Sequence, residues 1–520
     1  MSKSAIPLRA HNTPTRIRVE RAFILGLLLL ALGARLIPGP RVIDDAYVTF
    51  RYARNLVVGN GFVYNPGERV LGTTTPLYTL LLAGLALVTG CRDFTALALA
   101  VNALAGAASV GLLYSLGKRV TGHPAPAAAA ALLWAISPYT VTFAVGGMET
   151  DLTIALLLAA AYAHVSNRAR AMAVFSALAL LTRPDTAILL GLLWLDLTLT
   201  RQRVPWREGL ITLALLAPWL VFGTLYFGSP ITSSIAAKSV TYRLPPEAGF
   251  VGFLQHYATP FFEHRVLPSL GVFAVFVLYL TLCARGGLDL YRRERRTWPL
   301  IAYPFAYATV FAVANPLLFR WYLSPPLPFY FLLILTGVWA LGRDLRKLTV
   351  RNPQPAICAL FTAAALTLTL NAWTPHPDHG PDRPAPEMAW FKLELLYSQA
   401  ADVVLTRATP DDTLCAGDIG MLGYRTGLHM LDTVGLVTPE VAQYYPADSD
   451  IYVIGYAIPA DLVLTLDPDF IVIPEVYGRK GLLPDSRFQA QYRLLEKIET
   501  DIYGSDGMLV FQRTPHSKEE

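Results

Sequence analysis

The stretch FTALALAVNALAGAASVGLLYSL, residues 94–116, contains no charged side chain and is long enough to cross the hydrocarbon core of a bilayer as one helix. Ten further apolar runs of similar character surround it. Together they predict about eleven membrane-spanning helices, formed by residues 22–37, 94–116, 125–145, 152–165, 169–181, 186–200, 209–227, 266–284, 298–314, 323–341 and 356–373. The sequence therefore indicates a polytopic α-helical membrane protein.

Composition agrees with a lipid environment. Of the 520 residues, 54% are hydrophobic and 16% are charged, whereas soluble proteins carry about 25% charged residues. This deficit excludes a disordered chain, a nucleic-acid-binding module and an entirely soluble enzyme. The four cysteines lie far apart without CxxC spacing, so neither a disulfide framework nor a zinc site is indicated.

The distribution of Lys and Arg predicts the topology. Residues 77–89 form an apolar run of only about thirteen residues, which favours an interfacial or re-entrant helix on the outer face. With that placement, basic clusters fall in the inner loops, among them those of residues 16–21 and 292–296. The positive-inside rule then places residues 1–21 in the cytoplasm and the C-terminal tail outside, for a protein of the cytoplasmic (inner) membrane. The first span lacks an A-x-A site and is interpreted as uncleaved.

The tail, residues 374–520, differs from the rest in composition. Pro, Asp and Gly rise, and short strand-like runs such as 470–473 and 508–511 alternate with turns. We expect a soluble extracytoplasmic α/β domain that follows the membrane domain of residues 22–373. His376, His379, Asp378 and Asp382 have the residue types of a metal cluster, but they lie in a Pro-rich stretch and are interpreted as a solvated linker.

The first outer loop, residues 38–93, carries the strongest functional signal. It contains DDAYVTFRYARN at residues 44–55, a helix-compatible amphipathic segment. Asp44 and Asp45 are candidates for acid/base chemistry, and Arg51 and Arg54 are candidates for binding a phosphate. A structural interpretation stays open, in which the two aspartates only end one helix and cap the next.

Four other outer loops carry charged or aromatic side chains. The motifs are GMETD with Glu149, TRPD with Arg183, the segment PITSSIAAK with Lys238, and RWY with Arg320 and Tyr322. Each alone has a structural interpretation as a helix cap, a snorkelling cation or a solvated side chain. Together they bring cations and carboxylates to one face, as a site for a charged head group requires.

On these motifs and their order, the chain resembles the GT-C superfamily of membrane glycosyltransferases. Terminal arabinofuranosyltransferases and the polyprenyl-phosphate-sugar-dependent protein O-mannosyltransferases are the members most similar in pattern. The resemblance implies a GT-C-like fold with an inverting transfer of a single sugar from a polyprenyl-phosphate donor. The acceptor would be a hydroxyl of a cell-envelope glycan, lipid or protein on the extracytoplasmic face.

The resemblance also implies roles for individual residues. Asp44 would be the general base, and Asp45 would orient the acceptor or share the proton. Glu149 and Tyr322 would contact sugar hydroxyls. The leaving phosphate would be neutralised by Arg51, Arg54, Arg183, Lys238 and Arg320.

Several alternatives remain at this point. Leu71 and Tyr78 stand where the family often has an acidic residue and an aromatic pair, so the sugar, arabinofuranose or another, is left open. No metal or other cofactor is expected, with a divalent ion on Asp44 and Asp45 as the alternative. The rival function is a transporter or flippase of lipid-linked sugars, which would favour charged residues in mid-span and paired repeats.

Overall fold

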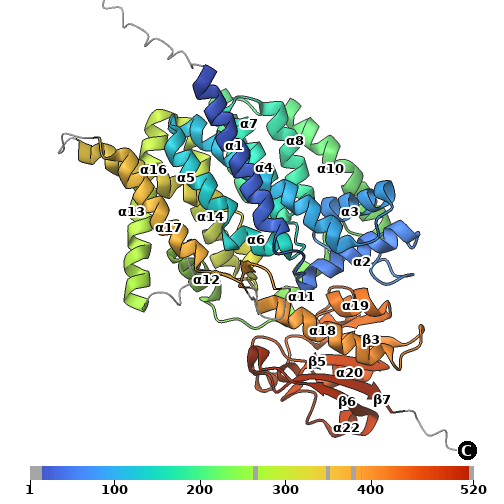
Figure 1. Ribbon diagram of the computed structural model, residues 1–520. Coiled ribbons are helices and arrows are strands. Elements are labelled where there is room, and N and C mark those ends of the chain that lie inside the picture. Colours follow the sequence, from blue (N-terminus) through green and yellow to red (C-terminus); the bar gives the residue numbers. More distant parts are fainter. Residues whose placement is uncertain (1–13, 262–267, 347–351, 376–381, 388, 515–520) are drawn as a thin grey trace, which may run out of the picture.

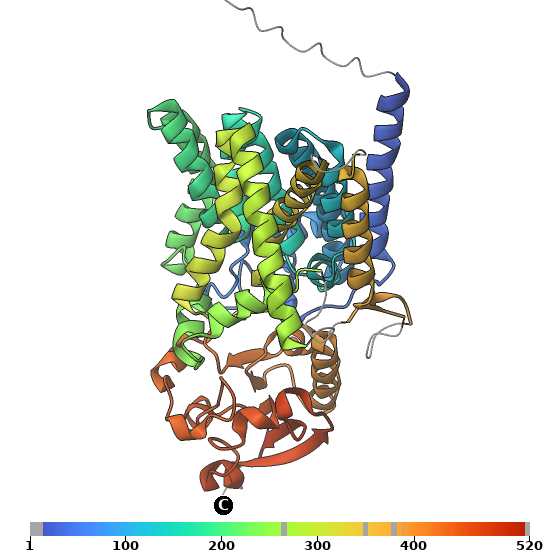
Figure 2. The same ribbon diagram turned by 90° about the vertical axis from the view of Figure 1, so that its left-hand side faces the viewer.

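The computed structural model describes residues 14–261, 268–346, 352–375, 382–387 and 389–514. A bundle of long helices forms most of it, and a smaller domain with a β-sheet lies at one end of the bundle (Figures 1 and 2). Ten of the eleven apolar runs lie largely within one helix each, and residues 125–145 are divided between α5 and α6. The bundle helices are α1 (Pro14–Leu36), α4 (Phe94–Thr121), α5 (Pro124–Ala135), α6 (Pro138–Val145), α7 (Thr150–Val165), α8 (Ala169–Thr182), α9 (Ala187–Arg201), α10 (Trp206–Phe227), α13 (Ser269–Arg293), α14 (Trp298–Ala314), α16 (Leu327–Leu345) and α17 (Gln354–Leu370).

Five helices in the described part of the chain are long and apolar enough to cross a membrane, or six if the bent pair α5 and α6 is one span. The pair bends by 41° at Ser137, where Pro138 begins α6. Helix α10 carries leucines such as Leu210 and Leu225 that are 55% and 80% exposed, which suits a lipid-facing surface. The helical membrane architecture is thus confirmed, whereas the count of about eleven spans remains a prediction.

Shorter helices cover the end of the bundle that faces the C-terminal domain. They are α2 (Asp44–Val58), α3 (Pro76–Thr89), α11 (Ser233–Thr241), α12 (Ala248–Ala258) and α15 (Arg320–Leu323). Helix α2 begins with two carboxylates, which suit the positive end of its dipole, and ends at Gly59, whose φ of 91° only glycine adopts easily. Helix α3, the expected short apolar helix, has Pro76 in its first turn and ends at Gly90.

The C-terminal domain is built on a five-stranded mixed sheet with the order β4-β3-β5-β7-β6. Strands β4, β3 and β5 are parallel to one another, and β7 is antiparallel to both β5 and β6. The strands are β3 (Thr413–Ala416), β4 (His429–Asp432), β5 (Phe470–Pro474), β6 (Tyr492–Ile498) and β7 (Met508–Arg513); β1 (Trp373–Thr374) and β2 (Ala385–Pro386) form a separate pair. The helices are α18 (Ala389–Leu405), α19 (Gly420–Thr426), α20 (Ala460–Leu466), α21 (Glu475–Gly478) and α22 (Ser486–Gln491). The expected α/β character is confirmed.

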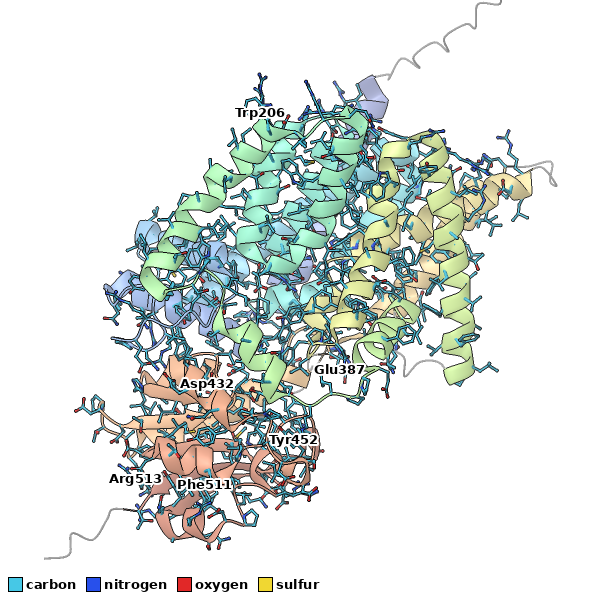
Figure 3. The ribbon with its side chains drawn as sticks, turned by 180° about the vertical axis from the view of Figure 1, so that it is seen from behind. Trp206, Glu387, Asp432, Tyr452, Phe511 and Arg513 are labelled. Carbon is cyan, nitrogen blue, oxygen red and sulfur yellow. The ribbon has the colours of Figure 1, made fainter. Side chains whose placement is uncertain are left out.

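The first loop and the C-terminal domain share one hydrophobic core. Buried side chains of α2, such as Phe50, pack in the same cluster as Leu422 of α19 and Ile471 of β5. Figure 3 shows the resulting polarity of the molecule: Trp206 lies at the end of the bundle remote from the domain that holds Asp432 and Arg513. The loop with the aspartate pair is therefore enclosed between bundle and domain.

Candidate active site

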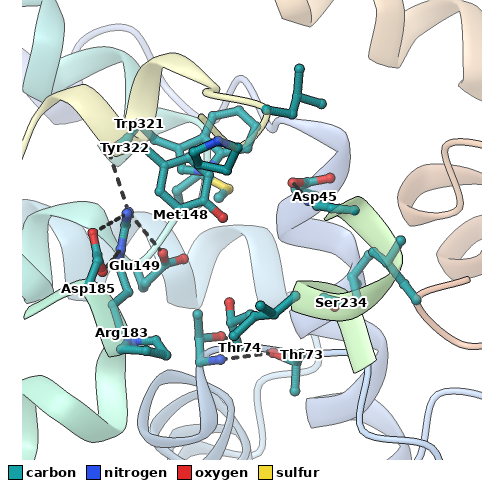
Figure 4. A pocket seen from close by; sticks show the side chains of 18 of the residues that line it. Asp45, Thr73, Thr74, Met148, Glu149, Arg183, Asp185, Ser234, Trp321 and Tyr322 are labelled. Atoms are coloured by element: carbon teal, nitrogen blue, oxygen red, sulfur yellow. Dashed lines mark hydrogen bonds and ion pairs between the residues drawn. The ribbon is translucent and has the colours of Figure 1, made fainter. Parts of the chain in front are cut away.

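A cavity of about 600 Å³ lies where the first loop, α11 and the ends of the bundle helices meet (Figure 4). Its polar lining includes Asp45, Glu149, Arg183, Asp185 and Lys238. Four of these were predicted from separate outer loops, and the structure brings them to one cavity. A cavity of this size with a few convergent polar groups is typical of a ligand site.

Helix α2 divides its side chains between two surfaces. Asp45, Val48 and Thr49 line the cavity, at the three- and four-residue steps of one helix face. Asp44 is one residue earlier, which turns its side chain by about 100° around the helix axis. The two adjacent carboxylates therefore do not face the same surface, and only Asp45 is among the residues that line the cavity.

Asp44 is bound to the C-terminal domain. Its two carboxylate oxygens accept hydrogen bonds from the backbone N–H groups of Gly420 (2.8 Å) and Met421 (2.7 Å), at the start of α19. Burial, followed by repulsion from Asp418 and Asp45, raises the pKa of Asp44 well above its usual value although these hydrogen bonds lower it. The geometry gives Asp44 a place in the junction between the domains.

Arg51 and Arg54 also face the C-terminal domain. The buried Arg51 guanidinium donates to the carbonyl oxygens of Tyr64 (2.9 Å) and Leu428 (2.7 Å). Arg54 donates to the carbonyl oxygen of Tyr424 (2.7 Å) and lies over its ring. Neither arginine lines the cavity, so the structure does not bring these two predicted phosphate ligands to the other cations.

Lys238 reaches the cavity from α11. Its ammonium nitrogen lies 3.7 Å from a carboxylate oxygen of Asp45 and over the ring of Phe319. Burial acts to lower the pKa of Lys238, but Asp45 and further acidic groups outweigh it and raise the pKa. Ser233, at the start of the helix, donates to the carbonyl oxygen of Leu436 (2.6 Å), and Leu436 itself lines the cavity. The C-terminal domain thus contributes to the cavity wall.

Arg183 is the centre of a second charged group. Its guanidinium donates to both carboxylate oxygens of Asp185 (3.0 and 2.8 Å), and one of its nitrogens lies 3.5 Å from Glu149 (Figure 4). The guanidinium also lies over the ring of Tyr322, 4.7 Å from its centroid. Asp185 in turn accepts a hydrogen bond from the hydroxyl of Tyr307 on α14. A fixed cation is therefore held beside Glu149 and Tyr322, the two predicted sugar contacts.

Arg320 is placed differently from the neighbouring Tyr322. Both residues belong to the short helix α15, but the side chain of Arg320 is exposed and is not among those that line the cavity. Its position gives no support to the predicted role in binding a phosphate of a ligand in this cavity.

Much of the remaining lining of the cavity is apolar. The apolar lining residues include Ile188 of α9, Ile235 of α11, Val310 and Phe311 of α14, and Leu317. Val310 and Ile235 are also about half exposed on the outside of the molecule. A cavity lined by both cations and apolar side chains matches an amphiphile with an anionic head.

Two features were missed by the sequence analysis. Asp185 was part of the TRPD motif, but only the fold shows that it holds Arg183 with both oxygens. Asp418 of the C-terminal domain has Asp45 and Lys238 as electrostatic neighbours, and burial, together with Asp45, raises its pKa to about 6. No local motif marks Asp418, because its importance depends on a contact between distant segments.

Among the residues that the structure describes, no group of three or more His, Cys, Asp or Glu side chains could hold a metal ion. His376, His379 and Asp378 of the predicted linker lie outside the described residues. Asp382 is described, but the interpretation of the four residues as a linker stays a prediction.

Comparison with known proteins adds relatives for parts of the chain. Residues 388–512 match a family described as "Domain of unknown function (DUF8728)". A terminal β-(1→2)-arabinofuranosyltransferase of Mycobacterium tuberculosis is 33% identical over 222 residues, which cover 38% of this chain and 35% of the relative. The enzyme of the same name from Corynebacterium glutamicum is 31% identical over 230 residues, covering 38% and 33%. The match thus spans about a third of the length of each relative.

Solved structures resemble the whole chain. ArnT from Cupriavidus metallidurans, bound to undecaprenyl phosphate, has a TM-score of 0.55 at 13% identity and covers 98% of this chain and 99% of its own. The oligosaccharyltransferase of Archaeoglobus fulgidus has a TM-score of 0.55 at 12% identity and covers 97% and 76%. Likeness at such low identity concerns the fold. The protein is a polytopic membrane protein with a GT-C-like fold, as the sequence predicted.

Proposed function

We propose that this chain is an inverting glycosyltransferase that moves one sugar from a polyprenyl-phosphate donor to a hydroxyl group. The acceptor would be a glycan, lipid or protein of the cell envelope, on the extracytoplasmic face of the cytoplasmic membrane. One observation carries the proposal: Asp45, Lys238 and Arg183 line a single cavity whose lining also includes several apolar side chains. The partial match to arabinofuranosyltransferases supports the reaction class and makes a pentose the first sugar to test.

The donor would lie with its prenyl chain along the apolar wall of α14 and its phosphate at the cations. The undecaprenyl phosphate in the ArnT structure supports a lipid of this chemistry. Lys238 is the more available cation, because Asp45, its partner at 3.7 Å, holds it loosely. Arg183, locked by Asp185, supplies a fixed charge that does not have to reorganise during the reaction.

In this proposal Asp45 is the general base. Its carboxylate takes the proton of the acceptor hydroxyl while the acceptor oxygen forms a bond to the anomeric carbon from the side opposite the phosphate. The bond from that carbon to the phosphate oxygen breaks, and the electron pair leaves with polyprenyl phosphate. Lys238 and Arg183 stabilise the charge that develops on the leaving group. Glu149 and Tyr322 would contact hydroxyls of the donor sugar.

In this proposal Asp44 positions Asp45, whereas the sequence led us to expect Asp44 itself to be the general base. Its hydrogen bonds to Gly420 and Met421 fix the start of α2 and thereby the direction of Asp45. The C-terminal domain would then serve the reaction by holding the base and by approaching the acceptor. Arg51 and Arg54 would stabilise the same junction.

Transfer assays test the proposal directly. The purified chain in nanodiscs is incubated with radiolabelled polyprenyl-phosphate pentoses and hexoses and with mixed envelope acceptors. We expect transfer from at least one donor, and its loss in Asp45→Asn. No transfer from any donor, together with movement of lipid-linked sugar across proteoliposomes, would replace the proposal by the transporter alternative.

A further inference from the structure

The connections of the C-terminal sheet reverse direction between β3 and β5. From β3 the chain passes through α19 to β4 on one side, and from β5 it continues toward β6 and β7 on the other side. The two strands are adjacent and parallel, so the loops at their carboxyl ends separate. In open α/β sheets such a switch point is the usual place for a ligand.

The residues that follow the two strands carry polar and aromatic side chains. Asp418 follows β3, and Tyr477 follows β5. The side chain of Tyr477 lies within hydrogen-bonding reach of Asp418. Asp418 also accepts a hydrogen bond from the hydroxyl of Tyr397 on α18. The ring of Tyr503 stacks near that of Tyr477, with 6.4 Å between their centroids. We call Asp418, Tyr477 and Tyr503 the switch-point surface.

Tyr503 has an unusual conformation for an aromatic residue. Its φ of 58° lies in the left-handed region, which residues with a side chain rarely adopt. The side chain nevertheless remains 47% exposed, although Asp418, Asp45 and Asp44 are its electrostatic neighbours. The backbone therefore presents a large ring to solvent beside the carboxylates.

The switch-point surface adjoins the cavity of the proposed transferase. The backbone N–H of Gly420, two residues after Asp418, is bound to Asp44, which immediately precedes Asp45. Asp45 and Lys238 act electrostatically on Asp418. A molecule bound at the switch-point surface would thus have its end next to the proposed base.

We infer that the switch-point surface binds a sugar residue of the acceptor and that the acceptor is a carbohydrate. The exposed Tyr503 ring packs against the apolar C–H face of the sugar, and Asp418 accepts hydrogen bonds from its hydroxyls. The next hydroxyl of the glycan then reaches Asp45. This inference rests on the proposed function, because it assigns the acceptor subsite of the same reaction.

Binding is measured on the full chain in nanodiscs by saturation-transfer difference NMR. The probes are methyl glycosides and oligosaccharides of arabinofuranose, galactofuranose, mannose and glucose, without any donor. We expect at least one oligosaccharide to bind, with an affinity at least tenfold lower in Tyr503→Ala and in Asp418→Asn. Tyr503→Phe keeps the ring and should bind within threefold of the unchanged chain.

Two control variants lie away from this surface. Tyr291, on α13, is 44% exposed and matches Tyr503 in exposure, and Asp450 is an exposed aspartate of the same domain as Asp418. Tyr291→Ala and Asp450→Asn should change the affinity less than twofold. Equal losses in these controls, unchanged binding in both test variants, or no binding of any probe by the unchanged chain would overturn the inference.

Donor turnover by the unchanged chain separates this inference from the proposed function. Turnover of a polyprenyl-phosphate sugar without any effect of Tyr503→Ala or Asp418→Asn on oligosaccharide binding would remove the subsite alone. Oligosaccharide binding that depends on both residues, in a chain that turns over no donor, would retain a carbohydrate site and remove the transferase.

Discussion

The ammonium nitrogen of Lys238 lies 3.7 Å from a carboxylate oxygen of Asp45, and both side chains are partly open to the cavity. The pair joins α2 to α11, two helices of separate loops. A partly exposed ion pair at this distance contributes little to stability, about 0–1 kcal/mol. In the proposed reaction, the phosphate of the donor can therefore replace Asp45 as the partner of Lys238 at small cost, which leaves the Asp45 carboxylate free to accept a proton from a hydroxyl.

Replacement of the proposed base should slow the chemical step. We expect Asp45→Asn to reduce transfer about 10²–10⁴-fold, because an amide accepts no proton, while donor affinity changes little. The measurement is single-turnover transfer together with equilibrium binding of the donor lipid. Asp44→Asn is the neighbouring comparison: if it abolished transfer in a fully folded protein while Asp45→Asn did not, the base would be Asp44.

Arg183 should matter for donor binding in a way that Arg320 does not. Arg183→Lys keeps the charge but loses the two-pronged contact with Asp185, so it should weaken donor affinity about tenfold and restore little of what Arg183→Ala loses. Arg320→Ala, at an exposed position outside the cavity lining, should stay within twofold. Donor-lipid binding to the three variants decides between them, and equal losses would contradict the assignment.

Glu394 makes the junction sensitive to pH. It is buried on α18 and accepts a hydrogen bond from the hydroxyl of Tyr47 (3.0 Å), and burial raises the pKa of Glu394 to about 7. The folded state binds a proton on the Glu394 carboxyl more tightly than the unfolded chain does. This protonation therefore stabilises the fold fully below pH 4.5, and its contribution is lost as the pH rises through about 7. The raised pKa of Glu394 corresponds to a change of about 3 kcal/mol in the free energy of unfolding.

Thermal unfolding in nanodiscs between pH 4.5 and 8 measures this effect. Glu394→Gln stays neutral throughout and should flatten the decline in melting temperature over that range. The decline will not disappear, because burial also raises the pKa of Asp418 and of Asp432 to about 6. The exposed Glu440, replaced by Gln, serves as the control. Identical pH profiles for Glu394→Gln and the unchanged chain would argue against a buried, protonated Glu394.

Gly420 leaves no room for a side chain at the junction. A Cβ at this position would lie 1.8 Å from the carbonyl oxygen of Asp44. We therefore expect Gly420→Ala to push α19 away from α2, to lower the melting temperature and to reduce transfer, whereas Gly427→Ala, at the exposed end of the same helix, meets no atom within 4 Å. Because φ is 71° at Gly427, that control carries a backbone cost of its own, and only a larger loss for Gly420→Ala supports the contact.

Cysteine labelling tests the predicted topology. In a Cys91→Ser background the other three cysteines are buried, so Ser449→Cys in the C-terminal domain and Arg203→Cys between α9 and α10 can be labelled selectively. An impermeant maleimide applied to intact cells should label position 449, and position 203 only after the membrane is opened. The reverse pattern would invert the assignment of the two faces.

The fold could be predicted from the sequence where local patterns decide it. Apolar runs without charge become helices, and the short run of residues 77–89 forms helix α3. The cavity residues Arg183, Lys238, Glu149 and Tyr322 were recognisable because charged or polar groups at the ends of apolar helices are costly unless they have a role.

The assignment of Asp44, Arg51 and Arg54 needed information that a local pattern lacks. In sequence the two aspartates are equivalent neighbours, and the arginines suit a phosphate. Their partners Met421, Leu428 and Tyr424 are about 370 residues away, so only the assembled fold shows which face of α2 each side chain occupies. A helical projection of residues 44–55 places Asp44 and Asp45 on different faces of the helix. It does not show which of the two faces the cavity.

The anchoring of Asp44 by residues 376 and 377 positions later has a consequence for biosynthesis. The helix that carries Asp45 leaves the ribosome well before α19, which supplies the amides that hold the start of α2. A nascent chain that already contains every bundle helix still lacks them. The anchor of Asp44 therefore forms only after α19 has been synthesised, and a chain that stops before α19 lacks it.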